Sequence, residues 1–279
     1  MADHRPLLEI MHEHLRSKEL QLPVFQPVAG KLQEMLGTRE VNIHQVANTI
    51  AEDQVLASHI LRVANSEFFA GLHKVTTIKD AMVRLGSKHV LILAKQTTAH
   101  HVYSAKNAII SVYIETLWKH ALTCALGAAW FAEKLGYTHV AQEAYMAGLL
   151  HDIGKLFLLK VLDDIHCSDT YNIRLSKGLI VGIVDAMHAE QGYELLKQWN
   201  IPDIYCEVAR DHHQENYDRS NEVLVLVRLV NLGCRKVGVS MHHDPTIVLA
   251  ATAEAQEGEI PEVPLAELEI MIEDALLVS

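Results

Sequence analysis

A histidine and an aspartate stand side by side in the stretch Ala147-Gly148-Leu149-Leu150-His151-Asp152-Ile153-Gly154-Lys155, directly after an apolar run. We expect the pair to lie at the edge of a core, where an unpaired charge is costly. Imidazole nitrogens and carboxylate oxygens both bind zinc, iron and manganese. A bound cation would offset the charge and so would a structural salt bridge, so the dipeptide alone leaves both interpretations open.

Three further segments carry histidines beside apolar helical patterns. His120 lies in the run 118–122, His188 lies in an amphipathic stretch, and His212 and His213 follow an apolar segment. Each of them taken alone is most simply a histidine at the edge of the core. Four such segments in a helical bundle can, however, direct their side chains toward one or two metal ions. The combined set therefore predicts a metal site.

The hydrophobic pattern predicts an all-α fold built as a multi-helix bundle. Apolar residues recur at spacings of three and four, and period-two alternation is sparse. A loop rich in Glu, Pro and Gly is expected over residues 254–264, and an amphipathic helix over 265–277. The other helices are expected over residues 4–19, 28–36, 43–50, 55–65, 78–84, 87–102, 109–135, 139–149, 151–165, 168–175, 179–197, 203–211 and 221–237.

Composition excludes several classes of function. The 279 residues are 49% hydrophobic and carry a formal net charge of −11, which argues against binding to a nucleic-acid polymer or an anionic membrane. The chain shows no signal-peptide pattern and no long apolar span, so we expect a cytoplasmic protein. The four cysteines form no CxxC pair and are expected to be reduced core residues: Cys124, Cys167, Cys206 and Cys234.

The order of the histidines and the aspartate resembles the metal-binding series of the HD superfamily, and in particular its HD-GYP branch, whose members hydrolyse cyclic dinucleotides. The resemblance implies one or two divalent iron, zinc or manganese ions that activate water for attack on phosphorus. It also implies a nucleotide or another phosphate ester as ligand, with Asp152 and Lys155 as catalytic residues and Lys155 near the phosphate. The metal ligands that it implies are His120, His151, Asp152, His188, His212 and His213.

Two departures from that family pattern weaken the enzymatic interpretation. The family closes its metal site with an aspartate in a late helix, and Asn231 stands at that place here. A neutral amide oxygen is a weaker ligand than a carboxylate, so we expect Asn231 to lower the metal affinity. No Gly-Tyr-Pro follows His213, where the sequence reads Gln-Glu-Asn-Tyr over residues 214–217. Specificity for cyclic di-GMP therefore does not carry over.

The N-terminal half resembles HDOD domains in four segments, which are Leu22-Pro23-Val24, residues 50–56, residues 61–66 and residues 81–86. The family usually has a proline where this chain has Gln54. The match covers roughly residues 20–235. Turn and cap chemistry is the expected role of Asn65-Ser66 and Leu85-Gly86.

The resemblance implies a three-part organisation. We expect an N-terminal helical HDOD subdomain over residues 1–106, an HD-like helical core with the metal site over 107–240, and a C-terminal loop and helix over 241–279. HDOD proteins are regarded as signalling output modules, many of which have lost the metal residues. A regulatory module that acts through a signalling protein partner and a metal-dependent phosphohydrolase therefore both remain open.

Overall fold

The computed structural model describes residues 7–16, 22, 24, 26–38, 41–69, 71–100, 105–168, 171 and 173–278. The regular elements in these ranges are helices, which confirms the all-α prediction. In chain order they are α1 (Leu7–Arg16), α2 (Gln26–Leu36), α3 (Ile43–Ala51), α4 (Gln54–Ala64), α5 (Ile78–Leu85), α6 (Ser87–His100), α7 (Ala108–Lys134), η1 (Thr138–Val140), α8 (Ala141–Leu150), α9 (Ile153–Cys167), α10 (Lys177–Gln198), α11 (Asp203–Asp211), α12 (Glu222–Val237), η2 (Leu249–Ala251), α13 (Ala253–Glu257) and α14 (Glu262–Val278).

Two of the predicted segments are wrong. The helix expected over 168–175 is absent from the described residues of that stretch, because the backbone at Ser168 turns to an extended conformation and ends α9. The loop expected over 254–264 contains α13 and the start of α14. Thr252 caps α13 by accepting a hydrogen bond from the backbone N–H of Ala255, and the buried Glu254 is held by Arg228. These side-chain contacts outweigh the loop-like composition.

A smaller difference concerns the start of α9. The helix expected from residue 151 begins at Ile153, because His151 and Asp152 form the turn between α8 and α9. The ends of two other predicted helices, residues 4–6, 17–19 and 101–102, lie outside the described residues.

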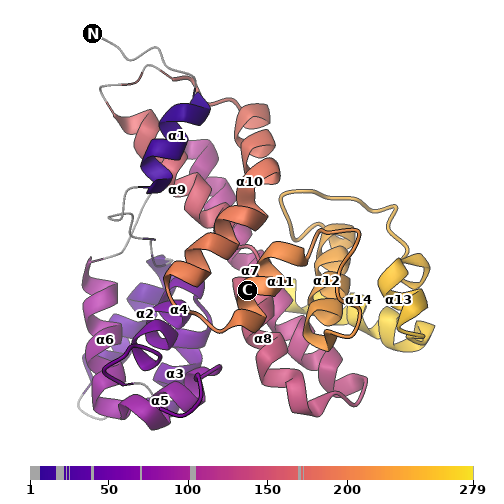
Figure 1. Ribbon diagram of the computed structural model, residues 1–279, viewed down its shortest axis with the longest axis horizontal. Helices are drawn as coiled ribbons and strands as arrows, with labels where there is room; N and C mark the ends of the chain where they lie inside the picture. The colour runs from indigo at the N-terminus through magenta and orange to yellow at the C-terminus, as the bar shows by residue number, and fades with distance from the viewer. Residues whose placement is uncertain are drawn as a thin grey trace.

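Helices α2 to α6 gather into one group, while α7 to α12 build a second group around the long helix α7 (Figure 1). Within the second group, α7 packs against α8 and α12, and α10 packs against α9 and α11, while α14 covers α7 and α12 from outside the group. Helix α1 stands apart from α2 to α6 and packs against α9 (Figure 1). The three-part division of the chain stays a prediction.

Hydrogen bonds join the two groups of helices. The Tyr145 hydroxyl donates to the Ala51 carbonyl at 3.1 Å, and the Tyr205 hydroxyl donates to the Thr76 carbonyl at 2.7 Å. Asn65 has the turn role that we expected, because its side chain bonds both the carbonyl, at 2.9 Å, and the N–H, at 2.8 Å, of Val75. The two tyrosine hydroxyls tie the end of α3 and the loop before α5 to α8 and α11.

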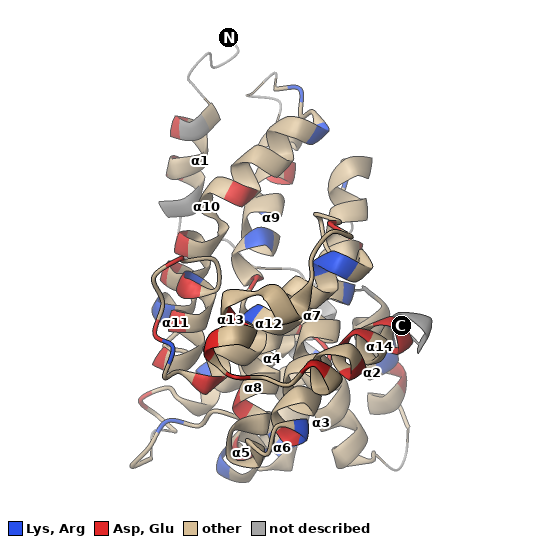
Figure 2. Ribbon diagram, turned by 90° about the vertical axis from the view of Figure 1, so that its right-hand side faces the viewer, with Lys and Arg blue, Asp and Glu red and all other residues tan. Residues whose placement is uncertain are grey.

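The surface carries the acidic excess of the sequence. Aspartate and glutamate residues recur along α14, near the C-terminus (Figure 2). No helix in the described part of the chain is long and apolar enough to cross a membrane.

Candidate metal centre

The structure brings four of the predicted histidines together around the carboxylate of Asp152. His120 lies on α7, His188 on α10, and His212 directly after α11, while His151 and Asp152 form the α8–α9 turn. Asp152 Oδ2 is 3.2 Å from His120 Nε2 and 3.4 Å from His151 Nε2. Asp152 Oδ1 is 3.3 Å from His212 Nε2 and 3.6 Å from His188 Nε2. Each carboxylate oxygen thus faces one pair of histidines.

The Nδ1 atom of each of these four histidines lies within hydrogen-bonding distance of a backbone carbonyl oxygen. A carbonyl oxygen can only accept a hydrogen bond, so each Nδ1 carries a proton and, in the neutral ring, Nε2 carries the lone pair. The four Nδ1-to-oxygen distances are 2.6 Å from His120 to Val239, 2.7 Å from His151 to Gly148, 2.8 Å from His188 to Val184 and 2.9 Å from His212 to Ala209.

The Oδ1 side of Asp152 has the character of a cation site. His188 Nε2 and His212 Nε2 are 3.4 Å apart, and both face the carboxylate oxygen. Asp152 Oδ1 is buried and satisfies no hydrogen bond within the described structure. Lone pairs that face one another and an anionic oxygen repel unless a positive charge lies between them. The donor set on this side therefore fits a divalent metal ion.

Charge within the site follows from burial and from the neighbours of Asp152. Burial opposes ionisation of Asp152, but the Lys155 ammonium group and a hydrogen bond from His120 hold its pKa well below the usual value, so the carboxylate is charged at neutral pH. Burial lowers the pKa of His188 to about 4 and that of His151 well below its usual value, so both rings are neutral. Lys155 Nζ lies 2.7 Å from Asp152 Oδ2 and is itself buried. Lys155 and Asp152 therefore form a structural salt bridge beside the candidate metal ligands.

His120 differs from the other histidines of the site. Burial lowers its pKa, but Cys124 and the Asp152 carboxylate more than compensate and raise it to about 10. A proton on His120 Nε2 is therefore available to Asp152 Oδ2 or to His151 Nε2, which lies 3.2 Å away. A metal ion that binds on this side takes the place of that proton.

His213 and Asn231 lie at the margins of the cluster. The ring centroid of His213 is 4.0 Å from that of His212, and the side chain is exposed. His213 belongs to a group with Asp152 and His188 whose potential ligand atoms all lie within 4.8 Å of one another. Asn231 is buried on α12, and no hydrogen bond or ion pair of the described residues joins it to the cluster.

Sequence reasoning missed two cysteines beside the centre. Cys124 Sγ lies 3.7 Å from His120 Nε2 and 3.6 Å from Cys234 Sγ. The prediction placed both thiols in the core, and both are buried and reduced. The spacing of four residues between His120 and Cys124 on a helix could have revealed one contact, because it puts both side chains on the same face.

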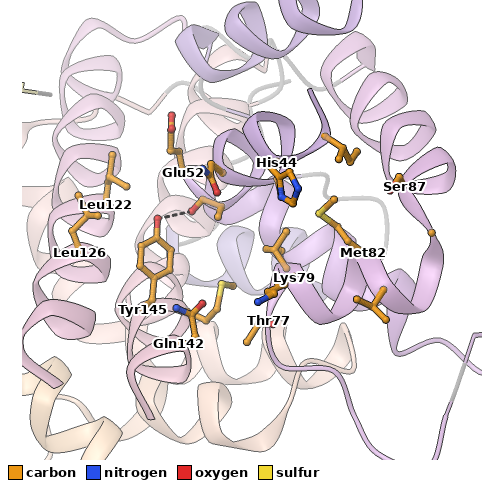
Figure 3. A pocket seen from close by; sticks show the side chains of 18 residues that line it. His44, Glu52, Thr77, Lys79, Met82, Ser87, Leu122, Leu126, Gln142 and Tyr145 are labelled. Carbon is orange, nitrogen blue, oxygen red and sulfur yellow. Dashed lines mark hydrogen bonds between the residues drawn. The ribbon is translucent and has the colours of Figure 1, made fainter. Parts of the chain in front are cut away.

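A groove with a volume of about 920 Å³ lies elsewhere, where α3 and α5 face α7 and α8. Figure 3 shows Leu122 and Leu126 on one side of it and His44 and Met82 on the other. Tyr145, which bonds the Ala51 carbonyl, stands between them (Figure 3). None of the predicted metal ligands lines this groove.

Comparison with known proteins identifies the family. A family model for the HDOD domain matches residues 22–215, more than half of the chain, and the protein belongs to the HDOD domain family. A curated relative, an uncharacterized protein from Treponema pallidum (strain Nichols), is 22% identical over 188 residues, which are 66% of this chain and 36% of the relative. This chain therefore spans about a third of the length of that relative.

Solved structures share the fold. The MmoQ response regulator from Methylococcus capsulatus str. Bath is 19% identical, with a TM-score of 0.70 over 90% of this chain and 98% of that chain. A virulence factor from Campylobacter jejuni subsp. jejuni is 16% identical, with a TM-score of 0.60 over 95% of this chain and 99% of that chain. At these identities the likeness concerns the arrangement of the helices.

Proposed function

We propose that this protein is a regulatory module of signal transduction whose His–Asp centre binds one or two divalent transition-metal ions. The observation that carries the proposal is the buried Oδ1 of Asp152, which has no hydrogen-bond partner among the described residues and faces the Nε2 atoms of His188 and His212. A buried anionic oxygen beside two imidazole lone pairs calls for a cation.

Two groups of residues would hold the metal. Asp152 Oδ1 would act with His188, His212 and His213, and Asp152 Oδ2 would act with His120 and His151. Asp152 would then contribute one oxygen to each group. Imidazole nitrogens together with one carboxylate suit zinc, iron and manganese, and the metal supplies positive charge that polarises bound water.

Burial favours a regulatory role over a catalytic one. The side chains of His120, His151 and His212 are 3% exposed or less, and Asp152 is 2% exposed. A catalytic metal keeps an open position for water or substrate, whereas a closed site contributes to the stability of the fold. The name of the MmoQ response regulator, which shares this fold, also supports a signalling role.

Metal analysis of the purified full chain tests the proposal. We expect stoichiometric zinc, iron or manganese in the wild type and its loss in His151→Ala. The matched control is His139→Ala, because His139 is an exposed histidine paired with Glu222 and should not affect the metal content. The absence of bound metal, together with no rise in Tm when zinc, manganese or ferrous iron is added, would refute the proposal.

A second candidate function is metal-dependent hydrolysis of a nucleotide or another phosphate ester. It is favoured by the ammonium group of Lys155 beside Asp152 and by the exposure of His213 at the rim of the centre. Such an enzyme should hydrolyse members of a phosphate-ester panel with added manganese, and Asp152→Asn should abolish turnover. If the manganese-loaded wild type shows no turnover, this candidate is wrong.

A further inference from the structure

A second group of potential ligands borders the His–Asp centre on the side of α12. It consists of His120, Cys124 and Cys234, whose ligand atoms lie within 4.8 Å of one another. Cys124 Sγ is 3.7 Å from His120 Nε2, 3.9 Å from His120 Nδ1 and 3.6 Å from Cys234 Sγ. All three side chains are 1% exposed or less.

Helix packing explains why these three residues meet. His120 and Cys124 are four residues apart on α7 and share one face of that helix. Cys234 lies on α12, which approaches α7 so closely that a Cβ on Gly127 would be 2.7 Å from the Val230 side chain. The thiols of two helices 110 residues apart in sequence are thereby brought into contact.

We propose that Cys124 and Cys234, together with His120, form a zinc site with thiolate ligands at this end of the centre. Thiolates bind Zn²⁺ far better than they bind Mn²⁺, so the two cysteines would make this end selective for the softer ion. The inference rests on the proposed metal centre, because His120 Nε2 also faces Asp152 Oδ2 at 3.2 Å. It adds ligands and a metal preference to that centre.

Charge balance favours zinc at this position. Binding would release three protons to solvent, those of the Cys124 and Cys234 thiols and the one on His120 Nε2, and two thiolates would neutralise one Zn²⁺. No electron is transferred in this step. A neutral set of ion and ligands suits a fully buried position better than two isolated thiolates would. His120 is already oriented for binding, since its Nδ1 donates to the Val239 carbonyl at 2.6 Å.

The remaining ligand of a four-coordinate zinc ion could come from the His–Asp centre. Asp152 Oδ2 and His151 Nε2 each lie 3.2 Å from His120 Nε2. Cys206 offers a contrast, because its thiol is equally buried but donates to the Ile201 carbonyl at 3.6 Å and belongs to none of the ligand groups of the described residues. It serves as the matched control.

Cobalt(II), titrated into the metal-free full chain, tests the inference through a spectroscopic signature of thiolate ligation. We expect a thiolate-to-cobalt charge-transfer band in the near ultraviolet for the wild type and for Cys206→Ser. The band should disappear in Cys124→Ser and in Cys234→Ser, and added Zn²⁺ should abolish it in the wild type. Circular dichroism checks that each variant folds.

The outcomes separate this inference from the proposed metal centre. Visible cobalt bands without the charge-transfer band would refute thiolate ligation and leave the His–Asp centre standing. No cobalt bands at all would refute both. If a cysteine variant does not fold, X-ray absorption of the zinc-loaded wild type decides, because zinc–sulfur distances of about 2.3 Å exceed the roughly 2.0–2.1 Å of zinc–nitrogen bonds. A zinc spectrum with nitrogen and oxygen neighbours alone would refute the inference.

Discussion

Gly154 on α9 lies so close to the backbone carbonyl of His188 on α10 that a Cβ on Gly154 would be 2.0 Å from that oxygen. It would also be 2.7 Å from the backbone nitrogen of Gly192. Because Asp152 precedes Gly154 by two residues and Lys155 follows it directly, this contact sets how closely the His–Asp turn approaches the helix that carries His188.

Gly154→Ala should therefore push α9 and α10 apart. Overpacking of this kind costs about 1–3 kcal/mol or more, and the displacement of His188 from Asp152 should weaken metal binding. Urea denaturation and a zinc titration measure the two effects. Gly182→Ala on the facing helix α10 is the control, because a Cβ there meets no atom of the described residues within 4 Å and should stabilise α10 by up to about 1 kcal/mol. Equal stability of the two variants would contradict this account of the contact.

Tyr205 links the metal-site helix α11 to the N-terminal loops through its hydrogen bond to the Thr76 carbonyl. Tyr205→Phe keeps the ring but leaves that carbonyl without this donor, which should lower the free energy of unfolding by about 1–3 kcal/mol. Tyr193→Phe is the control, since it keeps the ring over which Arg210 lies at 4.9 Å and should change stability by less than about 0.5 kcal/mol. Urea denaturation of both variants makes the comparison, and no loss in Tyr205→Phe would show that this bond does not stabilise the junction.

Much of the candidate centre could be predicted from the sequence, because its candidate ligands lie at helix ends or beside apolar residues that recur at helical spacing. His120, His188 and His212 each lie beside a core stripe, and packing three such helices around the His151-Asp152 turn brings the side chains together. The helical period alone does not show that the order of these residues matters. The resemblance to the HD superfamily identified that order as a metal-binding series.

The pairing of Cys124 with Cys234 could not be predicted in the same way. It depends on how α12 packs against α7, and no local pattern encodes a contact between residues 110 positions apart. The carbonyl partners of the histidines are invisible in sequence for the same reason, as the contact between His120 and the Val239 carbonyl shows. The short helix α13 was missed because it depends on one capping hydroxyl, that of Thr252.

Asn231 is a predicted ligand for which the described residues show no hydrogen bond or ion pair to the centre. It lies three residues before Cys234 on α12, so its helical face is turned toward α7. Asn231→Asp should tighten zinc binding, because a carboxylate is a stronger ligand than an amide oxygen. Isothermal titration with Asn48→Asp as a control, a change at an asparagine that lines the distant groove, measures the effect. An unchanged affinity in Asn231→Asp would show that residue 231 does not reach the metal.

Lys155 and a metal ion are alternative sources of positive charge for Asp152. The ammonium group lies 2.7 Å from Asp152 Oδ2, and both side chains are buried. Lys155→Met leaves the carboxylate without this partner, and breaking a buried pair typically costs about 3–5 kcal/mol. With saturating zinc the ion should supply the missing charge, so the deficit relative to wild type should shrink by more than half.

Urea denaturation of Lys155→Met and of the wild type, once with a chelator and once with saturating zinc, measures the loss of unfolding free energy under each condition. Lys134→Met is the control, because Lys134 pairs with Glu267 at 2.7 Å on the surface and its loss should cost at most about 1 kcal/mol with or without zinc. A deficit of Lys155→Met that is the same in zinc as in chelator would mean that no cation binds beside Asp152. The pair would then be a structural salt bridge and the histidines around it core residues.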